Sequence, residues 1–198
     1  MKKTAIIIGC LFLGWLVFHP TPKADWEGIR AADDPEQTED ASNRTWEHRN
    51  FFITARAKYH IQAIVLSKHH YWTGSDEDKL APYDLALGWG PMSDAKVING
   101  MEVTQGGRYY EYHWDKQPPI DPGDIVSHSA NTHILPADKN VLHGIKQIKR
   151  YDSVDLEGYL VDVVNKKDGA TLNTSLTRSD SGGGACEVFW VTDLKVLH

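Results

Sequence analysis

The chain has 198 residues, a net charge of −6 and a mean hydropathy of −0.44, with 41% hydrophobic and 24% charged residues. This composition excludes a protein with many membrane spans, argues against a disordered chain and fits a packed globular protein. Nucleic-acid-binding proteins usually present a basic face, because counterion release supplies much of their affinity. The acidic chain offers no obvious basic face, so we expect no nucleic-acid partner.

The N-terminus carries a short apolar segment. Lys2 and Lys3 precede the uncharged, mostly apolar run Ala5–Phe18, a pattern typical of an export signal or membrane anchor. As a helix this run would span roughly 21 Å against roughly 30 Å of hydrocarbon, which favours a cleaved signal. The nearest candidate cleavage site, after Ala24, has proline at −3, which favours an uncleaved anchor. We expect residues 1–24 to anchor the chain in the bacterial inner membrane with its domain in the periplasm; the alternatives are release after cleavage and a plain buried helix.

The two cysteines are expected to carry neither a lipid nor a disulfide within the exported part. Ile7–Cys10 is similar to a lipoprotein cleavage box, but the apolar segment continues well beyond Cys10, which disfavours lipidation. Cys186 is the other cysteine, so no disulfide can form within the exported part. We expect Cys186 to be a small buried apolar side chain in a strand, with a reactive or intermolecular cysteine as the alternative.

An acidic stretch follows the apolar segment. Residues 25–50 are poor in aliphatic side chains, and the run Asp33–Asp40 contains five acids and Pro35. This composition predicts a solvated linker that holds the domain away from the membrane. A partner-binding acidic tail is the alternative.

Residues 51–198 are expected to form a single β-rich domain. Apolar residues alternate with polar ones over Phe51–Leu66, which predicts one long strand or two joined in phase. Met101–Thr104 and Arg108–Trp114 flank a short glycine-containing connection, as in a hairpin.

A helix and closing strands complete this domain. Asp138 is a plausible N-cap for a helix that carries apolar residues on one side up to Ile148. The alternation in the strand that follows shifts phase around Gly158, as a bulge would cause, and two further strands are predicted at 170–176 and 186–196. The order is that of an OB-like antiparallel β-barrel, closed or partly open, with one or two short helices. The insertion 67–100 does not fit the minimal pattern, and a β-sandwich is the alternative.

An aromatic face is the first candidate binding site. Trp89 lies in Gly-Trp-Gly-Pro, a segment with a fixed backbone path, and Tyr110, Tyr112 and Trp114 share one face of a predicted strand. Trp89 either plugs one end of the barrel or joins the other three rings in a stacking wall for a ligand.

Three segments, Ala86–Asp94, Ser129–Ala137 and Gly184–Val191, are similar to segments of a group of short, uncharacterised bacterial proteins that are exported or membrane-anchored. The resemblance runs from about Phe51 to Val191. It implies a bacterial extracytoplasmic location and brings no activity, cofactor or catalytic residue with it.

Histidines provide a second candidate site. His128 and His133, with His113 or His143 as a third ligand, could supply the three imidazoles of some zinc sites. A spacing of five does not place two side chains on one face of a strand or helix, and no H-E-x-x-H motif or cysteine pair supports the site. Satisfied polar histidines at loops and barrel rims are the alternative.

A third candidate lies in a glycine-rich stretch. Residues 179–184 resemble the segment around the nucleophile of chymotrypsin-like proteases, which would make Ser181 the nucleophile. His69 and His70 lie in a context that does not match the base histidine of that family, and the domain is short for a double barrel. A flexible loop between two strands is the alternative.

The favoured interpretation is a non-catalytic, membrane-tethered, OB-like module that binds a small ligand or an envelope protein partner through Trp89, Tyr110, Tyr112 and Trp114. Its membrane contact would be the N-terminal helix. The alternatives are an exported protein that carries zinc or another divalent metal, or uses it for catalysis, at His128, His133 and His113, and a serine hydrolase at Ser181.

Overall fold

The structure is a computed structural model, and it describes residues 23–40, 42–177 and 184–197. It is mainly β, as predicted. No helix in these ranges is long and apolar enough to cross a membrane. The predicted apolar helix Ala5–Phe18, Cys10 and Ser181 lie outside the described residues.

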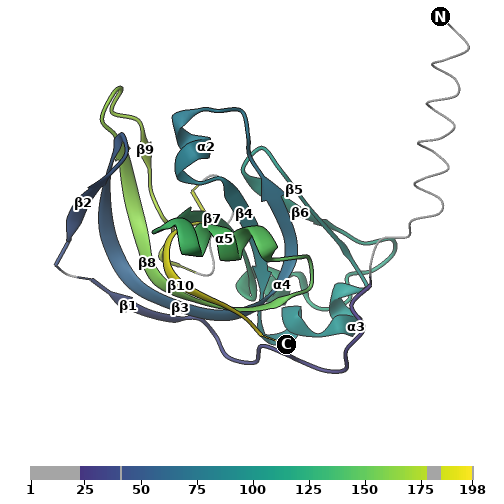
Figure 1. Cartoon of the computed structure of the whole chain (residues 1–198). Coiled ribbons are helices and arrows are strands. Elements are labelled where there is room, and N and C mark those ends of the chain that lie inside the picture. The colour runs from purple at the N-terminus through teal and green to yellow at the C-terminus, as the bar shows by residue number, and fades with distance from the viewer. Residues whose placement is uncertain (1–22, 41, 178–183, 198) are drawn as a thin grey trace, which may run out of the picture.

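Five strands close into a ring (Figure 1). Around the ring each strand pairs with the next in the order β3, β4, β7, β10 and β8, and β8 pairs again with β3. Their bounds are Phe51–His70 for β3, Tyr83–Gly88 for β4, Ser129–Pro136 for β7, Ser153–Asn165 for β8 and Glu187–Leu197 for β10. The predicted all-antiparallel pairing is wrong at one place, because β7 and β10 run parallel. These two strands are not joined by a hairpin, since a helix and β8 separate them in sequence.

The predicted long strand is β3, which serves two sets of neighbours. One edge pairs with β8 from Phe51 to Ile64. The other edge pairs in succession with β2 (Thr45–His48), β1 (Glu36–Glu39) and β4. Small side chains such as Ala57 and Ala63 turn inward and are fully buried, which fits a tightly closed ring.

The acidic segment 25–50 packs on the domain and does not form the solvated linker that its composition predicts. Both β1 and β2 lie within it, and Ala31 is buried with its backbone N–H donating to Oγ of Ser93. The physical reason is the open edge of β3 beside β4. Strand pairing satisfies that edge through backbone groups, so it does not require apolar side chains.

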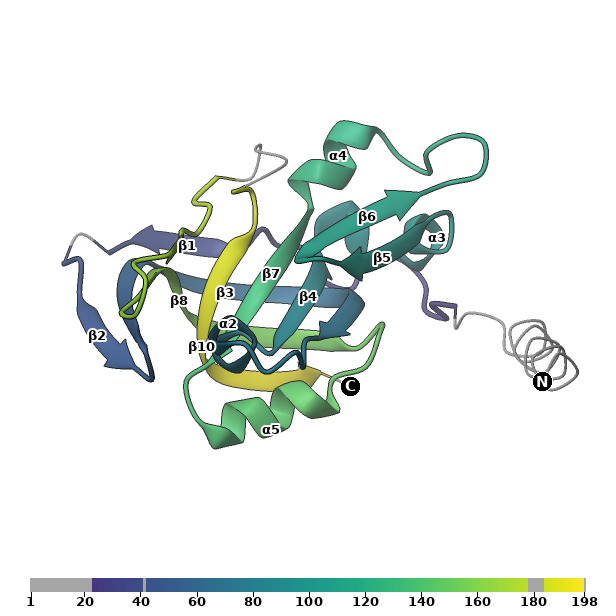
Figure 2. The same cartoon turned by 90° about the horizontal axis from the view of Figure 1, so that it is seen from above.

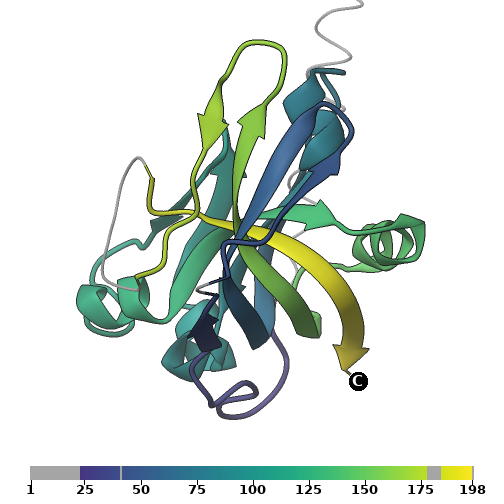
Figure 3. The same ribbon diagram turned by 90° about the vertical axis from the view of Figure 1, so that its left-hand side faces the viewer.

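The predicted helix is α5 (Lys139–Gln147), and the expected N-cap is confirmed. The Asp138 carboxylate accepts from the backbone N–H groups of Asn140 and Val141. Val141 and Ile145 are buried in the same cluster as the ring interior, so α5 covers the core. Figure 3 shows α5 on one side of the strands, with the hairpin of β8 and β9 (Thr171–Leu172) extending beyond them.

The predicted irregularity near Gly158 is present in the partner strand. The pairing of β10 with β8 shifts between Val191 and Asp193, and Val191 is the partner of Gly158. A Cβ atom at Gly158 would lie 2.0 Å from the carbonyl oxygen of Trp190. Only glycine allows this close approach of the two strands.

The outer face of the ring carries more helices than the one or two predicted. The described residues hold four α-helices and one 3-10 helix, because the insertion after β3 and the loop before β7 each form short helical turns. The elements outside the ring not yet bounded are α2 (Asp76–Leu80), η1 (Gly90–Ser93), α3 (Ala95–Ile98), α4 (Pro122–Ser127), β5 (Glu102–Gly106) and β6 (Tyr109–His113).

The predicted hairpin is β5–β6, and it lies against the outside of the ring (Figure 2). Val103 of β5 is buried in one apolar cluster with Ile64 and Leu66 of β3 and Ala86 of β4. This packing holds the turn of the hairpin over the outer faces of β4 and β7. Polar side chains fill the space beneath that turn.

Candidate functional site

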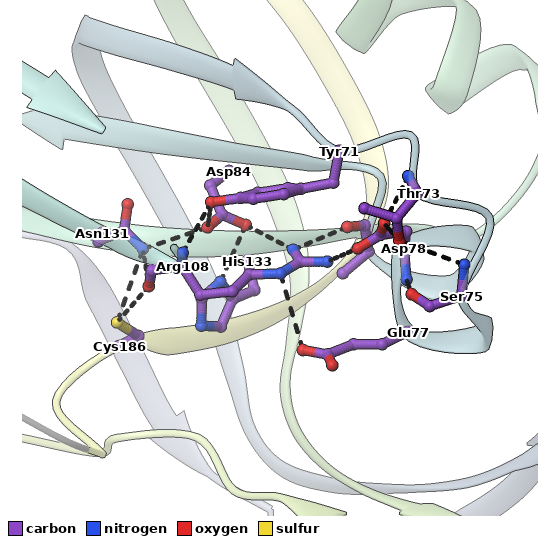
Figure 4. A network of polar contacts seen from close by, with 11 residues as sticks. Tyr71, Thr73, Ser75, Glu77, Asp78, Asp84, Arg108, Asn131, His133 and Cys186 are labelled. Carbon is purple, nitrogen blue, oxygen red and sulfur yellow. Dashed lines mark hydrogen bonds and ion pairs between the residues drawn. The ribbon is translucent and has the colours of Figure 1, made fainter. Parts of the chain in front are cut away.

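A fully buried carboxylate lies at the centre of this polar region (Figure 4). Asp84 is in β4, all of which is buried, and it points away from the apolar interior of the ring. Its Oδ1 lies 2.9 Å from Nδ1 of His133 and 3.0 Å from Nη1 of Arg108. Its Oδ2 accepts a hydrogen bond from the Tyr71 hydroxyl at 3.1 Å. A buried charge is stable only when it is paired and hydrogen-bonded in this way.

Arg108 joins the hairpin to the insertion. Its backbone adopts a φ of 70° at the hairpin turn. Its guanidinium also forms an ion pair with Asp78 of α2 at 2.8 Å, and it lies 3.7 Å from the centre of the Tyr71 ring. Burial, together with the neighbouring Asp84 carboxylate, raises the pKa of Tyr71 to about 12. Tyr71 therefore stays neutral, and its hydroxyl donates a hydrogen bond to Asp84.

His133 is held as a cation. It lies in β7 directly opposite Asp84 in β4, and only 5% of its surface is exposed. Burial by itself lowers the pKa of His133. The hydrogen bond that His133 donates to Asp84, with further contributions from Cys186 and from the charge of the Asp84 carboxylate, outweighs burial and raises that pKa from 6.5 to about 9. Nδ1 of His133 is engaged by Asp84, so Nε2 is the ring nitrogen that remains for a second partner.

Cys186 immediately precedes β10 and belongs to the same network. The parallel register of β10 on β7 pairs Glu187 with Thr132, which brings Cys186 beside Asn131. Its Sγ lies 3.6 Å from Nδ2 of Asn131 and 3.8 Å from the carbonyl oxygen of Arg108. Cys186 is half-buried in polar surroundings, so the expected apolar packing role is not observed.

Three neighbouring strands of the ring therefore supply an ordered set of groups. Asp84 comes from β4, His133 from β7 and Cys186 from the position just before β10; Asp84 pairs with His133, and His133 and Cys186 line the same small hollow. An acid that orients a histidine beside a thiol is the arrangement that activates a cysteine nucleophile.

Two hollows meet at Cys186. The larger has a volume of about 400 Å³ and extends along β6 and the start of β7. Its lining residues include Tyr110, Tyr112, Ser129, Asn131, Cys186 and Glu187. The smaller, about 140 Å³, is lined by Arg108, Tyr109 and His133 among others. Cys186 is thus accessible from two sides that differ in chemistry.

The four predicted aromatic residues do not form one face. Trp89 is 1% exposed inside the ring, and its Nε1 donates to Asp34 at 3.1 Å. Tyr110 and Tyr112 line the larger hollow. Trp114 stacks on Tyr112 with ring centres 5.9 Å apart. Trp89 is therefore a core residue inside the ring and does not join the other three rings in a stacking wall.

The three predicted histidine ligands each have a different partner. His133 binds Asp84, Nδ1 of His128 lies 2.8 Å from the carbonyl oxygen of Asp124, and His113 is exposed beside Glu111. The alternative third ligand, His143, is exposed on α5. Among the described residues, none of these four belongs to a group of three side chains close enough to share a metal ion.

A different group could hold a metal. His60, Asp155 and Glu157 lie on β3 and β8, and each offers a ligand atom within 4.8 Å of the others. Nε2 of His60 lies 3.0 Å from Oδ1 of Asp155, and Gln62 donates to the other oxygen of that carboxylate at 3.1 Å. Histidine and carboxylate ligands suit zinc.

Comparisons of the chain with protein-family models, curated proteins and solved structures find no match. Function is therefore inferred from the chemistry of the residues themselves. Reasoning from sequence missed Asp84 and Arg108 and assigned Cys186 an apolar role. One signal was available, since Asp84 is the sole charge within the otherwise apolar strand Tyr83–Gly88.

Proposed function

We propose that the ring is an OB-like barrel. Its strand order, the parallel pair β7–β10 and the position of α5 between the third and fourth ring strands along the chain support this assignment. The fold alone assigns no activity, because one fold hosts many functions.

We further propose that the domain is a cysteine-dependent enzyme that hydrolyses or transfers an acyl group. The observation that carries this proposal is the Asp84–His133 pair together with Cys186, which shares a small hollow with His133 and also lines the larger cavity. Cys186 is the nucleophile, His133 the acid–base group and Asp84 the residue that orients it. The aromatic side chains, expected to bind a ligand without catalysis, become part of the substrate site.

The reaction begins from a thiolate of Cys186 beside protonated His133. The sulfur attacks the carbonyl carbon of an ester, thioester or amide and forms a C–S bond. The bond to the leaving group breaks, and that group takes the proton from His133. Water then gives a proton to His133 and its hydroxide to the acyl carbon, and the sulfur leaves as thiolate. An alcohol or amine in place of water gives transfer.

Asn131 supports this chemistry by its position. Its Nδ2 donates to the carbonyl oxygen of Arg108 at 3.1 Å and lies 3.6 Å from the Cys186 sulfur. Its Oδ1 accepts from Gln105 at 2.7 Å, which fixes the amide orientation. A held amide donor beside the nucleophile can stabilise the oxyanion that forms during attack.

Alkylation of the thiol tests the proposal. In the full chain with Cys10→Ser, Cys186 is the sole thiol, and its reaction with iodoacetamide can be followed by mass spectrometry. A cysteine paired with an imidazolium reacts at pH 6 at least about tenfold faster than free cysteine. His133→Ala is expected to remove this advantage, and His143→Ala, on the exposed face of α5, to preserve it.

The outcome is decisive in both directions. A rate at pH 6 equal to that of free cysteine, with no effect of His133→Ala, contradicts the enzyme and leaves the non-catalytic binding module as the better account of the cavity. If both variants unfold at the same temperature as the parent protein, the difference in alkylation rate is due to the loss of the imidazole and not to unfolding.

Metal binding is a second candidate, supported by the convergence of His60, Asp155 and Glu157. It replaces the predicted site at His113 and His128. Elemental analysis of untagged protein tests it. Stoichiometric zinc that is lost in His60→Ala supports the site, and sub-stoichiometric metal in the parent protein contradicts it.

We also propose a bacterial envelope location, with residues 1–24 as the membrane contact and an envelope protein or small molecule as the partner. The two lysines and the apolar run Ala5–Phe18 support this location. Fractionation of cells that express the full chain tests it, because an anchored protein stays with membranes after a salt wash and a cleaved one does not.

A further inference from the structure

The larger hollow beside Cys186 is lined in part by tyrosines and carboxylates. Three tyrosines contribute to it, Tyr109, Tyr110 and Tyr112, together with the carboxylates of Glu111 and Glu187. No lysine or arginine lines it among the described residues, and its one basic side chain is the exposed His113. Its volume of about 400 Å³ is within the range of small-molecule sites.

The two carboxylates differ in position. Glu187 is 2% exposed and follows Cys186 directly, so its negative charge lies deep in the protein near the nucleophile. That charge contributes to the raised pKa of Tyr110, for which burial is the main cause. Glu111 is exposed on β6 and stands at the outer part of the cavity. Carboxyl groups therefore line the cavity at two depths.

The tyrosines add a second attraction of the same sign. The rings of Tyr110 and Tyr112 lie 5.9 Å apart and tilted by 55°, and Tyr110 is fixed by a hydrogen bond between its hydroxyl and Ser129 at 3.0 Å. The face of an aromatic ring attracts cations, and several rings together recognise alkylammonium groups. Aromatic rings combined with carboxylates favour a cation that also has an apolar surface.

The smaller hollow has a different character. It contains the guanidinium of Arg108 and the His133 ring, which is protonated at neutral pH. A substrate bound across Cys186 would therefore meet negative charge and aromatic rings on one side and positive charge on the other. This difference orients the substrate.

We infer that the larger cavity binds an alkylammonium group, and that the substrate of Cys186 is a small ester, thioester or amide whose acyl part carries this group. The leaving group lies in the smaller hollow, where His133 protonates it. This inference rests on the proposed cysteine chemistry for the identity of the reacting bond. The cation preference of the cavity can be measured separately.

Charged methanethiosulfonate reagents provide the test, because each adds its side group to a thiolate as a disulfide and releases methanesulfinate. The full chain with Cys10→Ser is treated with the 2-trimethylammonioethyl or the 2-sulfonatoethyl reagent, and both rates are divided by those of free cysteine. The cationic reagent is expected to be favoured at Cys186 by about tenfold. Glu187→Gln and Tyr112→Leu are each expected to reduce this preference to about threefold or less.

A matched control separates the cavity from the net charge of the protein. Glu47→Gln removes one carboxylate on β2, outside both hollows, and is expected to leave the preference unchanged. Benzyltrimethylammonium gives a reversible measurement in the unmodified cavity and is expected to slow alkylation of Cys186 by neutral iodoacetamide. This arm still reports if Glu187→Gln does not fold.

Two results overturn the inference. In one, the parent protein shows no preference for the cationic reagent, or the Glu187→Gln and Tyr112→Leu variants show the same preference as the parent protein. The other is the absence of protection by benzyltrimethylammonium. Either result, together with an iodoacetamide rate that depends on His133, rejects the cationic substrate and keeps the cysteine enzyme. A preference for the cationic reagent, together with an iodoacetamide rate that does not depend on His133, rejects the cysteine enzyme and keeps the cation-binding cavity.

Discussion

Oδ1 of Asp84 lies 2.9 Å from Nδ1 of His133 and 3.0 Å from Nη1 of Arg108, so one buried oxygen receives two cationic partners from different elements. His133 comes from β7, while Arg108 comes from the turn between β5 and β6. The carboxylate therefore fixes the histidine beside Cys186 and fastens the hairpin over the outer face of the ring. The geometry of the proposed catalytic group and the local stability therefore depend on the same atom.

Replacement of this carboxylate is expected to be costly. Asp84→Asn leaves Arg108 and His133 without their shared anion in a buried site, and the expected loss in the free energy of unfolding is about 3 to 5 kcal/mol. Urea unfolding measures it. Asp76→Asn is the control, because the Asp76 carboxylate binds Lys167 near the surface, where the loss of an ion pair costs much less. Equal losses in the two variants would contradict a central role for Asp84.

Stability is expected to depend on pH through His133. Its pKa is about 9 in the folded protein and near 6.5 unfolded, so the folded state binds the proton more tightly. The resulting stabilisation is fully present below about pH 6.5 and is lost as the pH rises through 9, and it amounts to at most about 3 kcal/mol. Urea unfolding at pH 6 and pH 9.5 measures this change. His133→Gln should flatten it, and an unchanged pH dependence in that variant would disprove the assignment.

Gly158 is expected to tolerate no side chain. A methyl group there would meet the carbonyl oxygen of Trp190, and relief of that clash would disturb the pairing of β8 with β10. Gly158→Ala should therefore lower the free energy of unfolding by at least about 2 kcal/mol. At Gly106, in β5, an added Cβ would contact nothing within 4 Å, so Gly106→Ala serves as the control with little change. Thermal unfolding of both variants distinguishes a steric effect from a general effect of alanine.

The acidic segment offers a test of whether it belongs to the domain. Oγ of Ser93 accepts from the backbone N–H groups of Arg30 and Ala31 at 3.2 and 3.0 Å. Ser93→Ala leaves these donors unsatisfied, which costs about 1 to 3 kcal/mol and should speed proteolytic cleavage between residues 25 and 35. Ser42→Ala, at an exposed position of the same segment, should not change the cleavage rate. Rapid cleavage of the parent protein in this range would instead support a solvated linker.

Much of the ring could be predicted from local patterns. The alternation in β3, the glycine turn before β6 and the Asp138 cap each act between near neighbours, and each is present. The packing of residues 25–50 could not be predicted in this way. It depends on an open edge of β3 that exists only after β3 and β4 have paired with an offset.

The candidate site was less accessible to prediction from sequence. Cys186, His133 and Asp84 are far apart along the chain, and no fixed spacing connects them. Only the pairing registers of β4 with β7 and of β7 with β10 bring them to one face. Tyr110 and Tyr112 could be recognised as a pair by their period of two, whereas the burial of Trp89 required knowledge of which way its loop turns.

The parallel pairing of β7 and β10 means that the site forms late, when the ring closes. β10 is the last strand along the chain, and its docking both closes the ring and carries Cys186 to His133. A copy that has not completed its fold holds the thiol and the imidazolium apart. If Cys186 is the proposed nucleophile, its reactivity reports on completed folding, and a partly folded chain has no activated sulfur with which to modify its neighbours.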